Sequence, residues 1–281
     1  MFEMTAPWQG RARPALEKGI AELAVKSSRV IFEALREIAQ ARAPLSAAEI
    51  AKTLSVPLTT AARALTTLEA VGYAARVNGS AKFVLGKSGQ KLAYAFMAQF
   101  PIRDLALPYL QQLTLLSGHS SSLFIRLGWY AVRIALISGT SSIVNVAPIG
   151  EARPLTSGAP SLAMLAQLSE AEVARAVERG TEKSAAPLRE ACERIRVQGY
   201  AWQVSPLESG GYDLAFPLAD SARAILGAVA LEGLIVGVED SRQQIDQARD
   251  AVAPLQQILL QGSSELIPHY EHIDPDEIRL G

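Results

Sequence analysis

The chain has 281 residues, of which 49% are hydrophobic and 20% charged, and its formal net charge is −1. This composition is typical of a folded globular protein and excludes wholesale disorder, and the length allows two domains. The single cysteine, Cys192, permits neither an internal disulfide nor a multi-cysteine metal site, which indicates a reducing compartment. No run of about eighteen apolar residues occurs and the first residues lack a signal-peptide core, so we expect a cytoplasmic protein with no membrane partner.

The segment 45–85 has the order of elements of a winged helix-turn-helix. Ser46-Ala-Ala-Glu49 has the pattern of a capping box and opens a first helix, which Pro57 ends. A second helix follows and closes at Gly72. Two short strands then flank Asn78-Gly79, the strongest short-range signal for a hairpin. This hairpin is the candidate wing, and DNA is the first partner to test.

The second helix of this motif divides into an apolar and a polar face. Its apolar positions recur at helical spacing, and hydroxyl residues with one arginine occupy the opposite face. Threonine is a mediocre helix former, but threonine and arginine can donate to phosphate oxygens and reach base edges in the major groove. The alternative is a solvated polar face on an interaction module. The apolar stripe is Leu58, Ala62, Leu65 and Leu68, and Thr66 shares the polar face. We predict DNA binding by Thr59, Thr60, Arg63, Thr67, Lys52 and, on phosphates at the wing, Arg76 and Lys82.

Charge is segregated along the chain. Residues 26–90 contain nine Lys and Arg against four Glu, a net +5, so the remainder carries −6. A basic segment on a mildly acidic body is typical of a DNA-binding domain joined to a domain that does not touch DNA. One recognition helix with this charge is too weak to hold DNA alone, so we expect a dimer. Its expected seam is the leftover apolar surface of the linker helices, such as Leu92, Phe96 and Leu105.

After the candidate wing the pattern changes. Ser88 caps one expected helix to about Gln99, and Pro101 begins another that ends near Gly118. Two sets of strands separated by helices then predict an α+β domain with a mostly antiparallel sheet. The expected strands are 121–127, 131–137, 200–205, 213–218 and 225–234, and the expected helices are 160–168, one after Ser169, 188–196 and about 240–260.

Five segments resemble, in order and spacing, the IclR family of bacterial transcriptional regulators: Pro57–Tyr73, Pro108–Leu113, Pro154–Ala159, Arg194–Tyr200 and Ala215–Pro217. The resemblance implies a winged-helix DNA-binding domain, a linker helix and a GAF-like domain that binds a small-molecule effector. It also implies a homodimer or a dimer of dimers on a double-stranded DNA operator. The expected domains are an N-terminal arm (1–25), the winged helix-turn-helix (26–87), the linker helix (88–101), the effector domain (102–262) and an acidic tail (263–281).

The resemblance also implies an effector site. Ser157, Gly158 and Ala159 match a family loop at the start of a helix, where backbone amides can face an anionic or polar ligand. The chain departs from the family pattern on later strands. Asp213 stands where many members have cysteine, and two small polar positions are occupied by Ala230 and Glu232.

The two acids, Asp213 and Glu232, bring negative charge to a place where many family effectors are carboxylates. Inside a cavity they need compensation, which a cationic or hydroxyl-rich ligand could supply. We therefore expect an effector that is not a small monoanionic acid. In the alternative, both acids face solvent or pair with Arg126 or Arg133 on neighbouring strands.

Catalysis finds little support in the sequence. His119, His269 and His272 are the only histidines, and none has a nucleophile-base arrangement with Cys192. The pair of late histidines lies among acids and prolines, which favours a solvated tail over a metal site. We expect a regulator that is not an enzyme and needs no cofactor. Two rivals remain: a winged-helix dimerisation module of a small-molecule enzyme, and a ligand-independent DNA-binding or scaffold protein.

Overall fold

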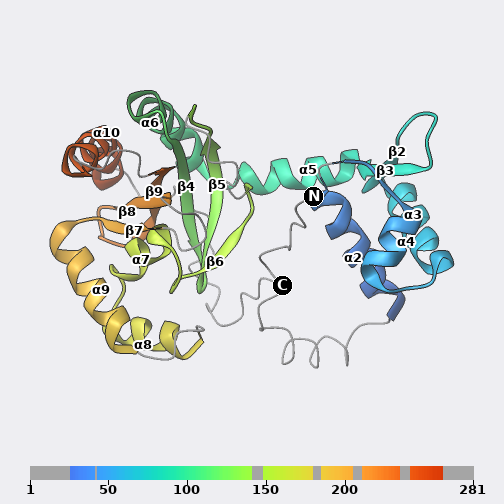
Figure 1. Cartoon of the computed structure of the whole chain (residues 1–281), viewed down its shortest axis with the longest axis horizontal. Coiled ribbons are helices and arrows are strands. Elements are labelled where there is room, and N and C mark those ends of the chain that lie inside the picture. Colours follow the sequence, from blue (N-terminus) through green and yellow to red (C-terminus); the bar gives the residue numbers. More distant parts are fainter. Residues whose placement is uncertain are drawn as a thin grey trace. The chain divides into compact units, whose positions relative to one another are not determined.

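The computed structural model describes residues 26–41, 43–140, 148–179, 185–204, 211–234 and 241–261 (Figure 1). The predicted arm over 1–25 and the acidic tail over 263–281 lie outside the described residues. The chain divides into two compact units, Met1–Phe96 and Met97–Gly281. Each unit has its own hydrophobic core.

The first unit is a winged helix-turn-helix, as predicted. Its helices are α2 (Lys26–Gln40), α3 (Ala47–Leu54), α4 (Leu58–Ala70) and α5 (Lys87–Met97). A small antiparallel sheet contains β1 (Leu45–Ser46), β3 (Lys82–Leu85) and β2 (Ala74–Arg76), in that order. The helices α2 and α3 both pack on α4, and the wing strand β3 contacts α2. The edge strand β1 was not predicted.

Local signals fix the ends of these elements. The Ser46 hydroxyl accepts from the Glu49 amide at 3.2 Å, and the Glu49 carboxylate accepts from the Ser46 amide at 2.7 Å, which completes the capping box. Gly72 follows α4 with φ of +76°, a conformation that favours glycine. Ser88 does not cap α5 as expected. It lies inside the helix, and its hydroxyl donates to the carbonyl of Val71 at 3.0 Å.

The apolar stripe of α4 differs from the prediction at Leu58 and Ala62. Ala61, Ala64, Leu65 and Leu68 are buried, whereas Leu58 is 55% exposed and Ala62 is only half-buried. Leu58 shares the angular position of Leu65, but it is the first residue of the helix, so no preceding turn completes its burial.

The second unit is an α+β domain with one antiparallel sheet, which confirms the predicted class. Its six strands have the order β6-β5-β4-β9-β8-β7, and every neighbouring pair is antiparallel. The strands are β4 (Ser120–Leu127), β5 (Tyr130–Ile137), β6 (Ala152–Pro154), β7 (Ala201–Val204), β8 (Gly211–Ala219) and β9 (Ile225–Leu234). The three-residue edge strand β6 was not predicted.

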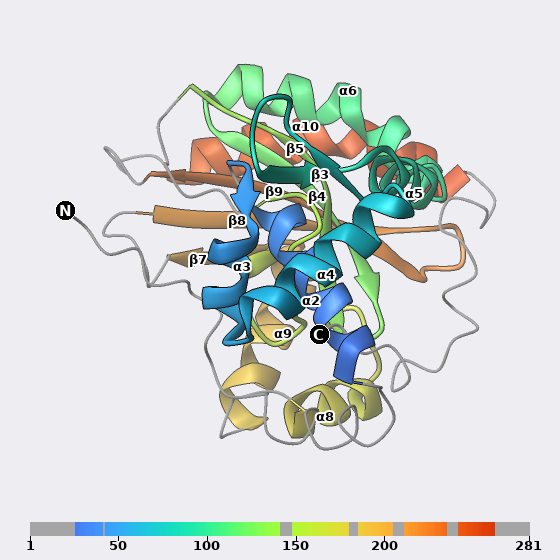
Figure 2. The ribbon, with the colours of Figure 1, turned by 90° about the vertical axis from the view of Figure 1, so that its right-hand side faces the viewer.

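Helices cover both faces of this sheet (Figure 2). On one face α6 (Pro101–Ser117) and α10 (Ser241–Gln261) pack against each other and against the sheet. On the other face α7 (Ala159–Leu165) lies against β8 and β9 and is backed by α9 (Ala185–Gln198), which α8 (Glu170–Arg179) contacts. All seven residues of α7 are buried. The sheet residues beneath α7 are therefore shielded from solvent.

Candidate functional site

The exposed face of α4 carries the polar side chains expected of a DNA-reading helix. The hydroxyls of Thr66 and Thr67 each donate to the carbonyl four residues earlier at 3.0 Å, which holds their side chains against the helix. Thr60 is half-buried. The exposed members of this face are Thr59, Arg63, Thr66 and Thr67.

The wing cations lie beside acids on the same unit. Arg76 pairs with Glu69 at 3.3 Å, and its guanidinium lies over the ring of Phe83, 4.6 Å from the centroid. Lys82 is 3.8 Å from Glu49. Exposed pairs of this kind contribute little to stability, so a phosphate can replace the acid at little cost. These contacts are compatible with phosphate binding and do not require it.

Lys52 and Arg63 differ from the wing cations. Both are exposed, and in the described part of the chain no carboxylate lies within ion-pair distance of either. Arg63 therefore presents its five N–H donors to solvent from the middle of the polar face of α4.

In the second unit, charged side chains gather on the sheet face that α7 covers. Arg133 on β5 is fully buried and donates to Glu232 on β9 at 2.5 Å. The hydroxyl of Ser122 donates to the other oxygen of Glu232 at 3.1 Å. The guanidinium of Arg133 also lies over the ring of Phe124, 4.9 Å from its centroid. Ion pairing and hydrogen bonds thus compensate both buried charges.

A second arginine, Arg153 on β6, lies in the same cluster. Its Nε donates to Glu151 at 3.2 Å. Its Nη1 is 3.8 Å from Asp213, and its Nη2 is 4.0 Å from Glu232, distances too long for hydrogen bonds. A Cβ on Gly158, the N-cap of α7, would be 3.4 Å from Nη1 of Arg153. The start of α7 and the charged cluster are therefore in contact range. We call Arg133, Glu151, Arg153, Asp213 and Glu232 the charge cluster.

Burial and neighbouring charges shift the pKa values of this cluster. Burial, followed by the nearby Glu232 carboxylate, raises the pKa of Asp213 to about 6, against the opposing effect of Arg153. Burial lowers the pKa of Arg133. For Arg153 burial also disfavours the charge, but the carboxylates around it outweigh burial and raise its pKa. Asp213 thus changes protonation near pH 6.

The structure brings some of the expected effector residues together. Asp213 and Glu232 are cross-strand partners on the α7 face, and Arg153 links them to Gly158. Ala230 is fully buried in the apolar core beside them. Glu232 pairs with Arg133, one of the two arginines named in the alternative.

Arg126, Ser157 and Ala159 have different surroundings in the structure from those expected. Arg126 does not pair with either acid, because it binds Glu172 at 3.1 Å. Ser157 is exposed, its amide donates to the Pro154 carbonyl at 3.0 Å, and Pro160 has no amide hydrogen to offer a ligand. Ala159 is fully buried in the core. Few amides are therefore available at the start of this seven-residue helix.

Sequence reasoning missed Arg153 and Glu151. Glu151 directly precedes β6 and Arg153 lies within it, just before the segment Pro154–Ala159 that carries the family resemblance. The two charged residues are separated by one alanine, and such alternation of polar and apolar residues is a weak signal for a strand.

Two other reactive side chains, Cys192 and His119, are buried. Cys192 is buried in α9, and burial raises the pKa of its thiol, which disfavours the thiolate. His119 shares a hydrogen bond with the hydroxyl of Tyr212 at 2.6 Å. No group of three or more metal-ligating His, Cys, Asp or Glu occurs among the described residues, and His269 and His272 lie outside them. None of the described helices is long and apolar enough to cross a membrane.

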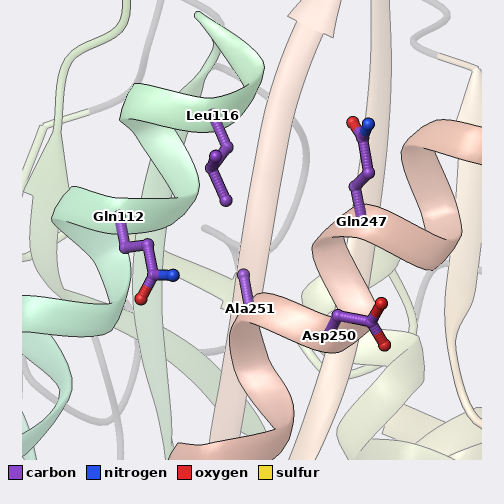
Figure 3. A pocket seen from close by; sticks show the side chains of 5 residues that line it. All are labelled: Gln112, Leu116, Gln247, Asp250 and Ala251. Carbon is purple, nitrogen blue, oxygen red and sulfur yellow. The ribbon is translucent and has the colours of Figure 1, made fainter.

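A hollow also occurs on the opposite face of the second unit, between α6 and α10 (Figure 3). It is lined by Gln112 and Leu116 of α6 and by Gln247, Asp250 and Ala251 of α10. It lacks the paired buried charges of the α7 face.

Comparison with known proteins identifies both units. The IclR helix-turn-helix domain matches residues 30–78, and the C-terminal domain of the bacterial transcriptional regulator IclR matches residues 94–256. The chain belongs to the IclR family. This confirms the resemblance in the sequence, and it makes the chain a transcriptional regulator with a helix-turn-helix domain and an IclR C-terminal domain.

Relatives of this IclR-family chain cover most of its length. The transcriptional repressor IclR of Escherichia coli (strain K12) is 25% identical over 240 residues, which is 82% of this chain and 88% of that protein. The HTH-type transcriptional repressor AllR of Salmonella typhi is 26% identical over 232 residues, which is 80% of this chain and 84% of that protein.

Solved structures share the fold. The Thermotoga maritima IclR has a TM-score of 0.70 and 22% identity, covering 84% of this chain and 97% of that one. An IclR homolog from Microbacterium hydrocarbonoxydans, complexed with 4-hydroxybenzoate, has a TM-score of 0.68 and 16% identity, covering 84% of this chain and all of that one (100%).

Proposed function

We propose that this IclR-family regulator binds a specific operator through α4 and the β2–β3 wing, and that a small molecule bound on the α7 face of the second unit modulates its operator affinity. The observation that carries the DNA part is the division of α4. One face is buried against α2 and α3, while the other presents Arg63 and threonines to solvent. Such a helix can enter the major groove without disturbing the core.

The effector part rests on the charge cluster beneath α7. Buried arginines and carboxylates in one place are costly unless they are compensated, and such clusters are frequent at ligand sites. The 4-hydroxybenzoate complex of a family member with the same fold supports ligand binding by this kind of domain. In this proposal the second unit is a sensor without catalytic chemistry, and the protein acts in the cytoplasm.

Two copies of the chain act together in this proposal, because one recognition helix reads only a few base pairs. The helix α5 has no buried residue, and it exposes Leu92 by 59% and Tyr94 by 78%. This surface supports the expected dimer seam. Light scattering at micromolar concentration should give a dimer or a multiple of it, and a monomer both with and without DNA would contradict the assembly.

The direct test of the DNA part is a gel-shift titration with Arg63→Ala and Lys82→Ala. Arg63→Ala should weaken binding to the operator by about 1–3 kcal/mol and leave non-specific binding nearly unchanged. Lys82→Ala should weaken binding to all sequences and lower the salt slope by about one. Arg194→Ala, an exposed arginine on α9 of the second unit, is the matched control. Parent-like titrations for both test variants would refute the groove assignment.

The rival reading, a ligand-independent DNA-binding protein, predicts no response to metabolites. A thermal-stability screen separates the two, since a ligand that binds only the folded state raises the unfolding temperature. Stabilisation that also changes operator affinity supports the sensor.

A further inference from the structure

Arg153 of the charge cluster has hydrogen-bond donors without a partner among the described residues. Its one hydrogen bond in that part of the chain runs from Nε to Glu151. Its Nη1 is 3.8 Å from an oxygen of Asp213, and its Nη2 is 4.0 Å from an oxygen of Glu232. A guanidinium can donate five hydrogen bonds, so the two Nη groups have N–H donors to offer to an acceptor placed beside Arg153 and the two acids.

Carboxylate oxygens in the charge cluster also lack hydrogen-bond donors among the described residues. Oε2 of Glu151 is buried and has no hydrogen-bond partner in the described part of the chain. The carboxylate of Asp213 is 22% exposed, and its only polar contact among the described residues is the 3.8 Å approach of Arg153. A buried carboxylate oxygen without a donor is costly, which makes both acids receptive to a donor from a ligand.

A ligand that satisfies both the Arg153 donors and the two carboxylates must donate and accept hydrogen bonds at once. A carboxylate can only accept and an ammonium can only donate, whereas hydroxyl groups and primary amides do both. The charges of the cluster also favour an uncharged ligand. The cluster holds three carboxylates and two guanidinium groups. A further anion would therefore meet unbalanced negative charge in a shielded place, while a cation would leave the Arg153 donors unfilled.

We propose that the charge cluster takes an uncharged ligand with adjacent hydroxyl or amide groups, and that Asp213 is the residue that excludes small carboxylates. The ligand would accept from Arg153 and donate to Asp213 and Glu151. This inference rests on the proposed effector role of the α7 face. It sets this chain apart from the family member that is complexed with 4-hydroxybenzoate.

In the described part of the chain, four charged groups act on Asp213. Glu232 on β9 and Glu151 oppose its ionisation, and Arg133 on β5 and Arg153 on β6 favour it. The neighbouring strand β7 places the uncharged Gln203 opposite Asp213, and α7 contains no titratable residue. A carboxylate that enters must therefore bring a proton to Asp213 or meet its repulsion, so binding of an acid becomes weaker as pH rises.

The test uses matched neutral and acidic probes on the full chain: 4-hydroxybenzamide with 4-hydroxybenzoate, glycolamide with glycolate, and glucose with gluconate. Calorimetric titration at pH 7.5 should give tighter binding for the neutral probe than for the acid in at least one pair. In no pair should the acid bind more tightly than the neutral probe. Acid binding should weaken up to about tenfold per pH unit between pH 6.5 and 8.5.

Asp213→Asn removes the charge in an isosteric side chain and loses no hydrogen bond found among the described residues. It should bind the acids at least about tenfold more tightly at pH 7.5 and remove their pH dependence. Asp213→Ser, which removes the same charge, is measured in parallel in case the first variant does not fold. Asp246→Asn, at an exposed aspartate on α10, is the control and should bind like the parent.

Tight, pH-independent binding of an acid to the parent chain would overturn the inference, as would the absence of binding by every neutral probe. Neither outcome bears on the proposed DNA binding, which the Arg63→Ala titration tests separately. Conversely, a chain that binds the neutral probes but no DNA would overturn the proposed function and leave the ligand class standing.

Discussion

The ion pair between Arg133 and Glu232 gives the sharpest prediction about the second unit. Glu232→Ala leaves the guanidinium of Arg133, which is 0% exposed, without the carboxylate it contacts, and removes the acceptor of the Ser122 hydroxyl. Breaking one side of a buried pair costs about 3–5 kcal/mol, because the remaining charge stays desolvated. For a unit of this size that corresponds to a fall of roughly 6–20 °C in the unfolding temperature.

Chemical denaturation followed by tryptophan fluorescence measures this loss, since Trp129 and Trp202 both lie in the second unit. The control is Glu170→Ala. Glu170 pairs with Arg196 at 2.9 Å, but its side chain is 68% exposed, so the change should cost less than about 1 kcal/mol. The double variant Arg133→Met/Glu232→Leu removes both charges and should recover most of the stability. Equal losses for Glu232→Ala and Glu170→Ala would refute the buried-pair argument.

Three further predictions concern both units. Leu65→Ala should destabilise the first unit by about 2–5 kcal/mol, whereas Leu58→Ala, at a 55% exposed position, should cost less than about 1 kcal/mol; similar losses would contradict the observed face of α4. Gly72→Ala should destabilise by more than about 1 kcal/mol in thermal melts, because φ is +76° and the new Cβ would lie 2.7 Å from the Ser88 hydroxyl, and a neutral effect would contradict it. The pKa of Asp213 is about 6 when folded and about 4 when unfolded, so its ionisation opposes folding. Relative to Asp213→Asn, the parent should therefore lose about 2–3 kcal/mol as pH rises from 4 to 6 and then level off, and a difference that stays flat in urea titrations would rule this out.

Local signals were enough to predict the helix-turn-helix and the wing hairpin of the first unit. These signals are the Ser46 and Glu49 capping box, Pro57 and the Asn78-Gly79 turn. Each acts over a few residues, so the nearby sequence alone determines where the helices end and where the hairpin turns. Leu58 was misplaced because helical spacing gives the angular position of a residue and not the point along the helix at which the core ends. That limit is set by the tertiary packing of α2 and α3 on α4.

The charge cluster was only partly predictable. Asp213 and Glu232 were singled out because they depart from a family pattern, but Arg133 and Glu232 are separated by 99 residues in the chain. Their contact depends on the register of β4 between β5 and β9, with its bulge after Leu123, and strand register is set by packing across the whole sheet. Arg153 was missed because its strand has only three residues.

In the proposed function, α4 reads DNA sequence and a ligand bound to the second unit modulates that binding. The most direct measurement is the recovery and sequencing of fragments that the purified chain retains from its own genome, alongside Arg63→Ala. We predict a two-fold symmetric motif whose half-sites are about one helical turn, or a multiple of it, apart. The motif should be lost or blurred in Arg63→Ala. Fragments without a common motif, or a motif unchanged in Arg63→Ala, would contradict the account.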